Sequence, residues 1–128
     1  MSERKSAVAI EKVTLAEKFA AFSERWTPKI VGELNGQHVK LSKIFGAFVW
    51  HQHEREDELF LVHRGSFRME FRDRTIELSP GDILIVPRGV EHRPVADEEA
   101  EILLFEPAGT LNTGNVVSER TVVDPEHL

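Results

Sequence analysis

The stretch from residue 50 to residue 65, W-H-Q-H-E-R-E-D-E-L-F-L-V-H-R-G, carries two histidines, an acidic loop and an apolar run. The histidines, His51 and His53, are separated by one residue. In a β-strand, residues two apart project from the same face, so the two imidazoles can converge on one ion. The spacing therefore predicts a pair of nitrogen ligands near the end of a strand.

The residues before His51 indicate where this pair would face. Alternation traced backward places Val49, Ala47 and Phe45 on the same face as His51. That face would be an apolar interior wall ending in two nitrogen donors. A metal site surrounded by apolar side chains is the common arrangement in proteins.

Two further residues can complete the site. Glu58 begins an apolar run in which alternate residues would share its face, so its carboxylate can point toward the histidine pair. His92 follows a turn shaped by Pro87 and Gly89, which would hold its side chain at a fixed angle. Three imidazoles and one carboxylate make a competent site for a first-row transition metal.

The rest of the chain reads as one all-β domain. Asn35-Gly36 is a strong signal for a type I′ hairpin turn. Many short strands at regular spacing predict an antiparallel sandwich or barrel, with a core barrel over about residues 28–107. The expected strands are 29–34, 38–50, 58–64, 66–71, 74–78, 82–86 and 100–105. Residues 1–8 and the polar stretch 108–128 are the expected tails.

A short helix is expected before the barrel, over about residues 15–24. Thr14 and Glu17 form a capping-box pattern at its start. Leu15, Phe19 and Phe22 recur at helical spacing and should form one apolar face that packs on a larger element.

Composition excludes several functional classes. The 128 residues are 41% hydrophobic and 30% charged, which is typical of one globular domain. With no cysteine, the chain has no disulfides, no thiolate nucleophile and no sulfur ligand for a metal. A net charge of −6 with scattered basic residues argues against nucleic acid as a partner. The lack of a long apolar run or leader-like N-terminus argues against a membrane segment and predicts a cytoplasmic protein.

The two histidine-bearing segments resemble the two motifs of the cupin superfamily. The first family motif reads Gly, a gap, His-x-His, three or four residues, Glu, six residues, Gly; the second reads Gly, five residues, Pro-x-Gly, two residues, His, three residues, Asn. The match covers residues 46 to 92. The matching positions are His51, His53, Glu58, Gly65, Gly81, Pro87, Gly89 and His92. Resemblance implies a small jelly-roll-like β-barrel in which His51, His53, Glu58 and His92 bind one divalent metal ion: iron, manganese, nickel, cobalt or zinc.

The chain departs from the family pattern at two positions. Gly46 lies four residues before His51 where five is usual, and Ala96 stands where asparagine is expected. Neither position is a metal ligand in the family. Among the acidic residues of the loop, Asp57 fits the shorter allowed gap, but the six-residue run to Gly65 favours Glu58.

The remaining histidines and the outward-facing apolar residues have simpler interpretations. His63 alternates onto the face opposite to Glu58, and His38 and His127 have no partner spacing, so all three are expected on the surface or at a dimer contact. The alternation that turns His51 and Glu58 inward turns other residues outward and predicts a homodimer, with the helix as a competing cover. These outward residues are Phe48, Trp50, Leu59 and Leu61.

Three functions are compatible with these features. The first, implied by the resemblance, is a metal-dependent enzyme of the dioxygenase, isomerase, decarboxylase or lyase type that acts on a small oxygenated molecule. The second is a non-catalytic protein that binds a sugar or small acid, and the third is a metal-free epimerase-like barrel. Apart from the four expected ligands, the sequence marks no residue as a general acid or base.

Overall fold

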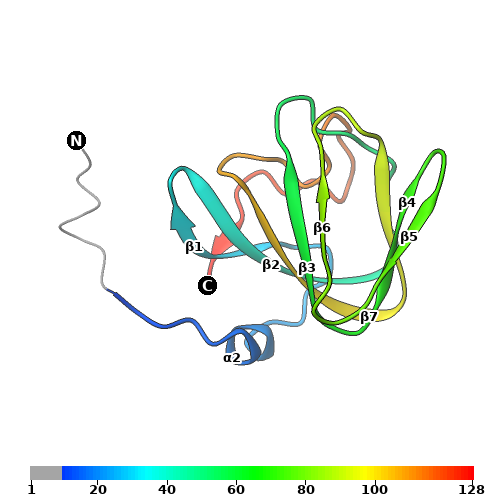
Figure 1. The fold of residues 1–128 in the computed structure, drawn as a ribbon. Helices are drawn as coiled ribbons and strands as arrows, with labels where there is room; N and C mark the ends of the chain where they lie inside the picture. The colour runs from blue at the N-terminus through cyan, green and yellow to red at the C-terminus, as the bar shows by residue number, and fades with distance from the viewer. Residues whose placement is uncertain (1–9) are drawn as a thin grey trace.

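A computed structural model describes residues 10–128 and contains one short helix and a single eight-stranded sheet (Figure 1). The expected tail over residues 1–8 lies outside the described residues. The helix α2 spans Leu15–Ala20. The strands are β1 (Lys29–Leu34), β2 (Gln37–Ala47), β3 (Glu58–Arg64), β4 (Phe67–Phe71), β5 (Thr75–Leu78), β6 (Ile83–Val86), β7 (His92–Pro107) and β8 (Glu126–His127).

The strand β7 organises the sheet. It pairs antiparallel with β2 along most of its length, with β4 through its first half and with β3 through its second half. β6 adds to β3 and β5 adds to β4, which gives two curved walls that face each other across the core (Figure 1). The sheet is not closed, and the arrangement is jelly-roll-like. The expected all-β class is therefore confirmed.

Strand β7 begins much earlier than the expected 100–105 segment. Its first half contains Pro94 and the acidic run from Asp97 to Glu99, which obscure the strand pattern in the sequence. The acidic residues are exposed, whereas Val95 and Ala96 are buried against the core.

The main core lies between the two walls. Alternate residues of the strands point inward, such as Phe60 and Val62 on β3 and Ile102 and Leu104 on β7. Burial of such side chains stabilises the fold by about 1.5–3 kcal/mol each. The inward orientation expected for the face of Glu58 is thus confirmed.

The predicted alternation before His51 is wrong. The alternation of β2 continues through Gly46, so Phe45 and Ala47 are exposed while Phe48 points into the core and stacks on Trp26 at a centroid distance of 4.6 Å. The inward and outward sides exchange only after Phe48. Ala47 pairs with Val95 and His51 pairs with His92, so one extra residue lies between Ala47 and His51, as in a β-bulge.

The helix α2 is shorter than expected, ending at Ala20 instead of residue 24. Thr14 occupies the N-cap position, but its side chain makes no capping hydrogen bond, so the predicted capping box is wrong. Phe19 and Phe22 still pack together, with Leu41 of β2 and Leu103 of β7, on the outer side of the sheet. α2 thus covers part of the outer face, as its apolar side predicted.

The residues after Pro107 return along the barrel instead of leaving it. Asn115 and Gln52 exchange two hydrogen bonds, from the Gln52 backbone N–H to Asn115 Oδ1 (2.9 Å) and from the Asn115 backbone N–H to Gln52 O (3.0 Å). The chain then adds β8 beside β1 in parallel. The polar stretch therefore anchors the loop that carries His51 and His53.

Among residues 10–128, no helix has the length and apolar character needed to cross a bilayer.

Candidate metal centre

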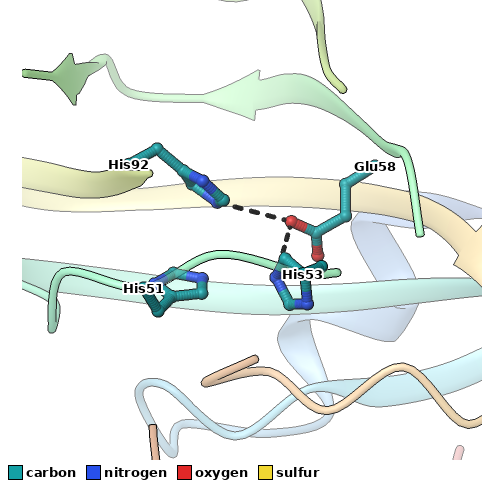
Figure 2. Close-up of side chains that lie close together, drawn as sticks. All are labelled: His51, His53, Glu58 and His92. Atoms are coloured by element: carbon teal, nitrogen blue, oxygen red, sulfur yellow. Dashed lines mark ion pairs between the residues drawn. The ribbon is translucent and has the colours of Figure 1, made fainter. Parts of the chain in front are cut away.

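Four buried side chains meet at one end of the core (Figure 2). Three are histidines: His51 and His53 follow β2, and His92 opens β7. The fourth is Glu58, which opens β3. Each offers one ligand atom, and these four atoms all lie within 4.8 Å of one another. The structure thus brings together all four residues that the sequence selected.

Backbone pairing fixes the relative positions of the two segments. His51 and His92 exchange two backbone hydrogen bonds, at 3.1 and 2.9 Å. The backbone N–H of Gly89 donates to His53 O at 2.8 Å, which ties the turn before His92 to the histidine loop. Residues far apart in sequence therefore hold their imidazoles in a fixed arrangement.

The ring orientations fit a metal ion. Nδ1 of His51 lies 2.9 Å from Val49 O, and Nδ1 of His92 lies 2.8 Å from Val90 O. A carbonyl accepts only from a protonated nitrogen, so both rings carry hydrogen on Nδ1 and leave the lone pair of Nε2 free. This is the usual way in which a protein prepares a histidine to bind a metal.

Buried polar atoms without partners show whether the four residues suit a metal ion. His53 Nε2, His92 Nε2 and Glu58 Oε1 lie deep in the protein without a hydrogen-bond partner among residues 10–128. Glu58 Oε1 is 3.0 Å from His53 Nε2 and 3.5 Å from His92 Nε2 (Figure 2). Unsatisfied buried polar groups are costly, and one cation at their centre would satisfy all three. The donor set of nitrogen and carboxylate oxygen suits a divalent transition metal.

The electrostatics of the cluster keep its ligands ready for a cation. Burial, followed by the neighbouring His92, lowers the pKa of His51 to about 4, so this imidazole is neutral at pH 7. Burial acts to raise the pKa of Glu58, but the neighbouring Glu106, His53 and His92 outweigh it and hold that pKa well below its usual value. Glu58 is therefore ionised.

The other candidate residues lie elsewhere. The Asp57 carboxylate accepts hydrogen bonds from the backbone and guanidinium of Arg88, so it points away from the cluster. His63 stacks on Phe19 of α2 and lies 3.0 Å from Glu101, on the outer side of the sheet. His38 and His127 lie near each other, also outside the cluster.

A pocket opens beside the four residues. Its walls are mostly apolar, and its polar lining comes from Ser42, His51, Glu58, Glu106 and Asn112. Trp26, Phe48, Phe60 and Leu104 are among the apolar lining residues. Pockets with apolar walls and a few fixed polar groups are typical of small-molecule sites.

One charged pair in this region was not predicted from the sequence. Lys40 Nζ donates to Glu106 Oε2 at 2.7 Å, and both side chains are almost completely buried. The signal was present in the alternation, because Lys40 shares a face of β2 with Ser42 and Ile44, and Glu106 shares a face of β7 with Leu104.

The open jelly-roll with three histidines and a glutamate at one end defines a small β-domain with a metal-site-like centre. Comparison with known proteins agrees: the family model described as "Cupin domain" matches residues 37–106. This chain belongs to the cupin family. The match begins at β2 and ends on Glu106, so it contains every residue of the cluster.

Individual proteins show the same likeness. The chain is 35% identical over 94 residues to the uncharacterized protein YdbB of Bacillus subtilis (strain 168), covering 73% of this chain and 76% of that protein. Its structure resembles a cupin-2 domain containing protein from Shewanella frigidimarina, with 41% identity and a TM-score of 0.73, covering 74% of this chain and 93% of that one. It also resembles protein NMB1881 of Neisseria meningitidis, with 28% identity, a TM-score of 0.71, and coverage of 77% and 100%.

Proposed function

We propose that this cupin is a metal-dependent enzyme acting on a small oxygenated molecule, with His51, His53, Glu58 and His92 as ligands of one divalent transition metal ion. The observation that carries the proposal is the group of buried, unpartnered ligand atoms at the centre of the cluster. A protein that bound nothing here would bear the full cost of burying these groups.

The adjoining pocket supports a small-molecule substrate. It is lined by His51 and Glu58 themselves, and most of its remaining wall is apolar. When bound, the ion would supply Lewis-acid polarisation of a substrate oxygen. The chain itself supplies the rigid ligand frame, the neutral imidazole of His51 and the ionised carboxylate of Glu58. The reaction belongs to the dioxygenase, isomerase, decarboxylase or lyase type.

The test is metal content followed by activity. Protein purified without a metal-affinity step is analysed by elemental analysis, and we expect one transition metal ion per chain. Purified protein is then supplied with small hydroxy acids, keto acids and sugars, with oxygen uptake and product formation monitored. Absence of stoichiometric metal after exposure to iron, manganese, nickel, cobalt and zinc would refute the proposal.

A matched pair of variants tests whether metal binding depends on the cluster or on any histidine of the chain. His92→Ala removes a buried cluster residue, and we expect it to lose the metal while keeping the β-fold in circular dichroism. His127→Ala removes an exposed histidine outside the cluster and should bind as much metal as the wild type. Equal metal content in both variants would count against the ligand assignment.

We also propose that the chain forms a homodimer through the outer face of β3 and β6. Leu59 and Leu61 point outward and pair in register with Ile85 and Ile83, each of which is 57% exposed. α2 packs on Leu41 and Leu103 and leaves these isoleucines uncovered. Phe48 is excluded from this surface because it lies in the core. Sedimentation analysis should show a wild-type dimer, and the substitution Leu59→Glu should dissociate it. A single wild-type species of 14.6 kDa, the mass of one chain, would refute the proposed dimer.

A further inference from the structure

The Lys40–Glu106 pair lies inside the barrel, next to the candidate metal centre. Lys40 projects from β2 and Glu106 from β7, two strands that pair along their length. The two residues are 2% and 1% exposed. Charged residues are rarely buried so completely unless they are paired. Even a buried ion pair seldom makes a protein more stable than apolar residues of similar volume would.

The hydrogen bonds of this pair leave one atom unused. Glu106 Oε2 accepts from Lys40 Nζ at 2.7 Å, and Lys40 Nζ also donates to Thr110 O at 3.2 Å. Glu106 Oε1 is buried and finds no hydrogen-bond donor among residues 10–128. Lys40 therefore fixes the carboxyl group of Glu106 in place, while the second oxygen of that group, Oε1, stays without a partner.

The unpaired oxygen belongs to a residue that lines the pocket. Glu106 and Glu58 are both pocket-lining residues. Burial and the neighbouring Glu58 raise the pKa of Glu106 well above its usual value, while Lys40 acts to lower it. A carboxyl oxygen can bind a hydroxyl group in either protonation state, because a hydroxyl group both donates and accepts. A donor from outside the chain, placed in the pocket, would satisfy the oxygen that the protein leaves unpaired.

From this geometry we propose that Glu106, held by Lys40, binds the hydroxyl group of the substrate, and that the substrate is a small hydroxy acid. The proposal rests on the proposed function, because it places the substrate in the pocket beside the metal. A hydroxyl group fits the site because it can both donate and accept a hydrogen bond. Glu106 is a binding residue here.

The charge balance favours an acid over a neutral sugar or alcohol. With a divalent ion in place, the positive charges of the ion and Lys40 exceed the negative charges that Glu58 and Glu106 can carry. Among residues 10–128, Glu58 and Glu106 are the only Asp, Glu, Lys or Arg residues that line the pocket. A ligand with one carboxylate would reduce this buried excess of positive charge, which costs free energy in a low-dielectric site.

The experiment measures the preference for a hydroxyl group. Zinc-loaded wild-type protein is titrated in a calorimeter with two matched pairs, lactate with propanoate and glycolate with acetate. The hydroxyl preference is the ratio of the two dissociation constants within a pair. We expect Glu106 to contribute about tenfold to this ratio, the usual effect of a hydrogen bond to a charged group.

Three variants isolate that contribution. Glu106→Leu should lower the hydroxyl preference about tenfold, and any preference that survives belongs to chelation by the ion. Glu106→Gln, whose amide can still pair with Lys40 and with a hydroxyl, should restore part of the preference. The double variant Lys40→Met with Glu106→Leu replaces the whole pair by apolar residues of similar size, so it keeps the test available if the single leucine variant does not fold.

Zinc content is measured first in every protein, so that two failures remain distinguishable. A wild type that takes up no zinc overturns both the proposed function and this inference. A wild type that binds zinc, but whose hydroxyl preference is the same in all variants, overturns the inference alone. The inference also fails if no hydroxy acid binds at millimolar concentration, or if folded Glu106→Leu loses its zinc, since Glu106 would then serve only to hold Glu58.

Discussion

Charged groups inside the barrel differ from those on the outer side of β4 and β7 in the ion-pair and hydrogen-bond partners that they find. On the outer side, Arg68 bridges Glu70 and Asp97, and Arg93 also binds Glu70, so each charge has an opposite partner in contact with water. Inside, polar atoms of His53, Glu58, His92 and Glu106 have no hydrogen-bond partner among residues 10–128. The outer network is satisfied by its own ion pairs, whereas the inner one leaves atoms free to bind a ligand.

The largest expected effect comes from breaking the buried pair. Lys40→Met leaves Glu106 buried without its cation, and we expect a loss of about 3–5 kcal/mol in the free energy of unfolding. Arg68→Met is the matched change on the outer surface and should cost about 0–1 kcal/mol. Urea denaturation of both variants measures the difference. Equal losses would show that burial does not separate the two networks.

The second largest expected effect is the change in stability when a metal is bound to the inner network or removed from it. Because a ligand that binds only the folded state stabilises it, zinc at a hundredfold excess over its dissociation constant should add about 2.7 kcal/mol. That corresponds to a rise of about 10 °C in Tm for a domain of this size. EDTA should reverse the rise. His92→Ala should show no response to zinc, and Arg68→Met should respond like the wild type.

A smaller effect is expected where the C-terminal segment contacts the histidine loop. Gly114 has a φ of 56°, and a Cβ there would clash with the carbonyl group of Gln52 and lie 3.1 Å from His51 Cδ2. Gly114→Ala should therefore cost about 1–3 kcal/mol and weaken zinc binding by displacing His51. Gly109→Ala is the control, because Gly109 also has a positive φ but no atom within 4 Å of its Cβ position. Chemical denaturation and zinc titration compare them.

The smallest effect concerns the outer network and its response to acid. Hydrogen bonds from Arg93 and then Arg68 lower the pKa of Glu70 below its usual value. A lowered folded-state pKa stabilises the protein above the unfolded pKa, and this contribution disappears as the pH falls through the folded value. Glu70→Gln should thus be slightly less stable than the wild type at pH 7 and equal to it at strongly acidic pH. A gap in Tm that stays constant with pH would contradict this.

Much of the fold and all four cluster residues could be predicted from sequence, because strand alternation and motif spacing are local signals. The prediction failed where one residue changes the periodicity: an extra residue between Ala47 and His51, relative to the paired segment of β7, leaves Phe48 inward and Phe45 outward. The sequence does not mark this extra residue, because it is defined only by the pairing with β7. The Lys40–Glu106 pair was missed for a different reason, since buried charges become visible only when distant strands are placed side by side.

The clamp between Gln52 and Asn115 also sets an order of assembly. The loop that carries His51 and His53 is made well before its partner, because Asn115 lies 63 residues after Gln52 in the chain. His92 likewise takes its place only when β7 pairs with β2 and β4. A nascent chain therefore has no complete centre to offer a metal. Under the proposed function, only the finished domain, with its rigid frame, can select an ion by geometry.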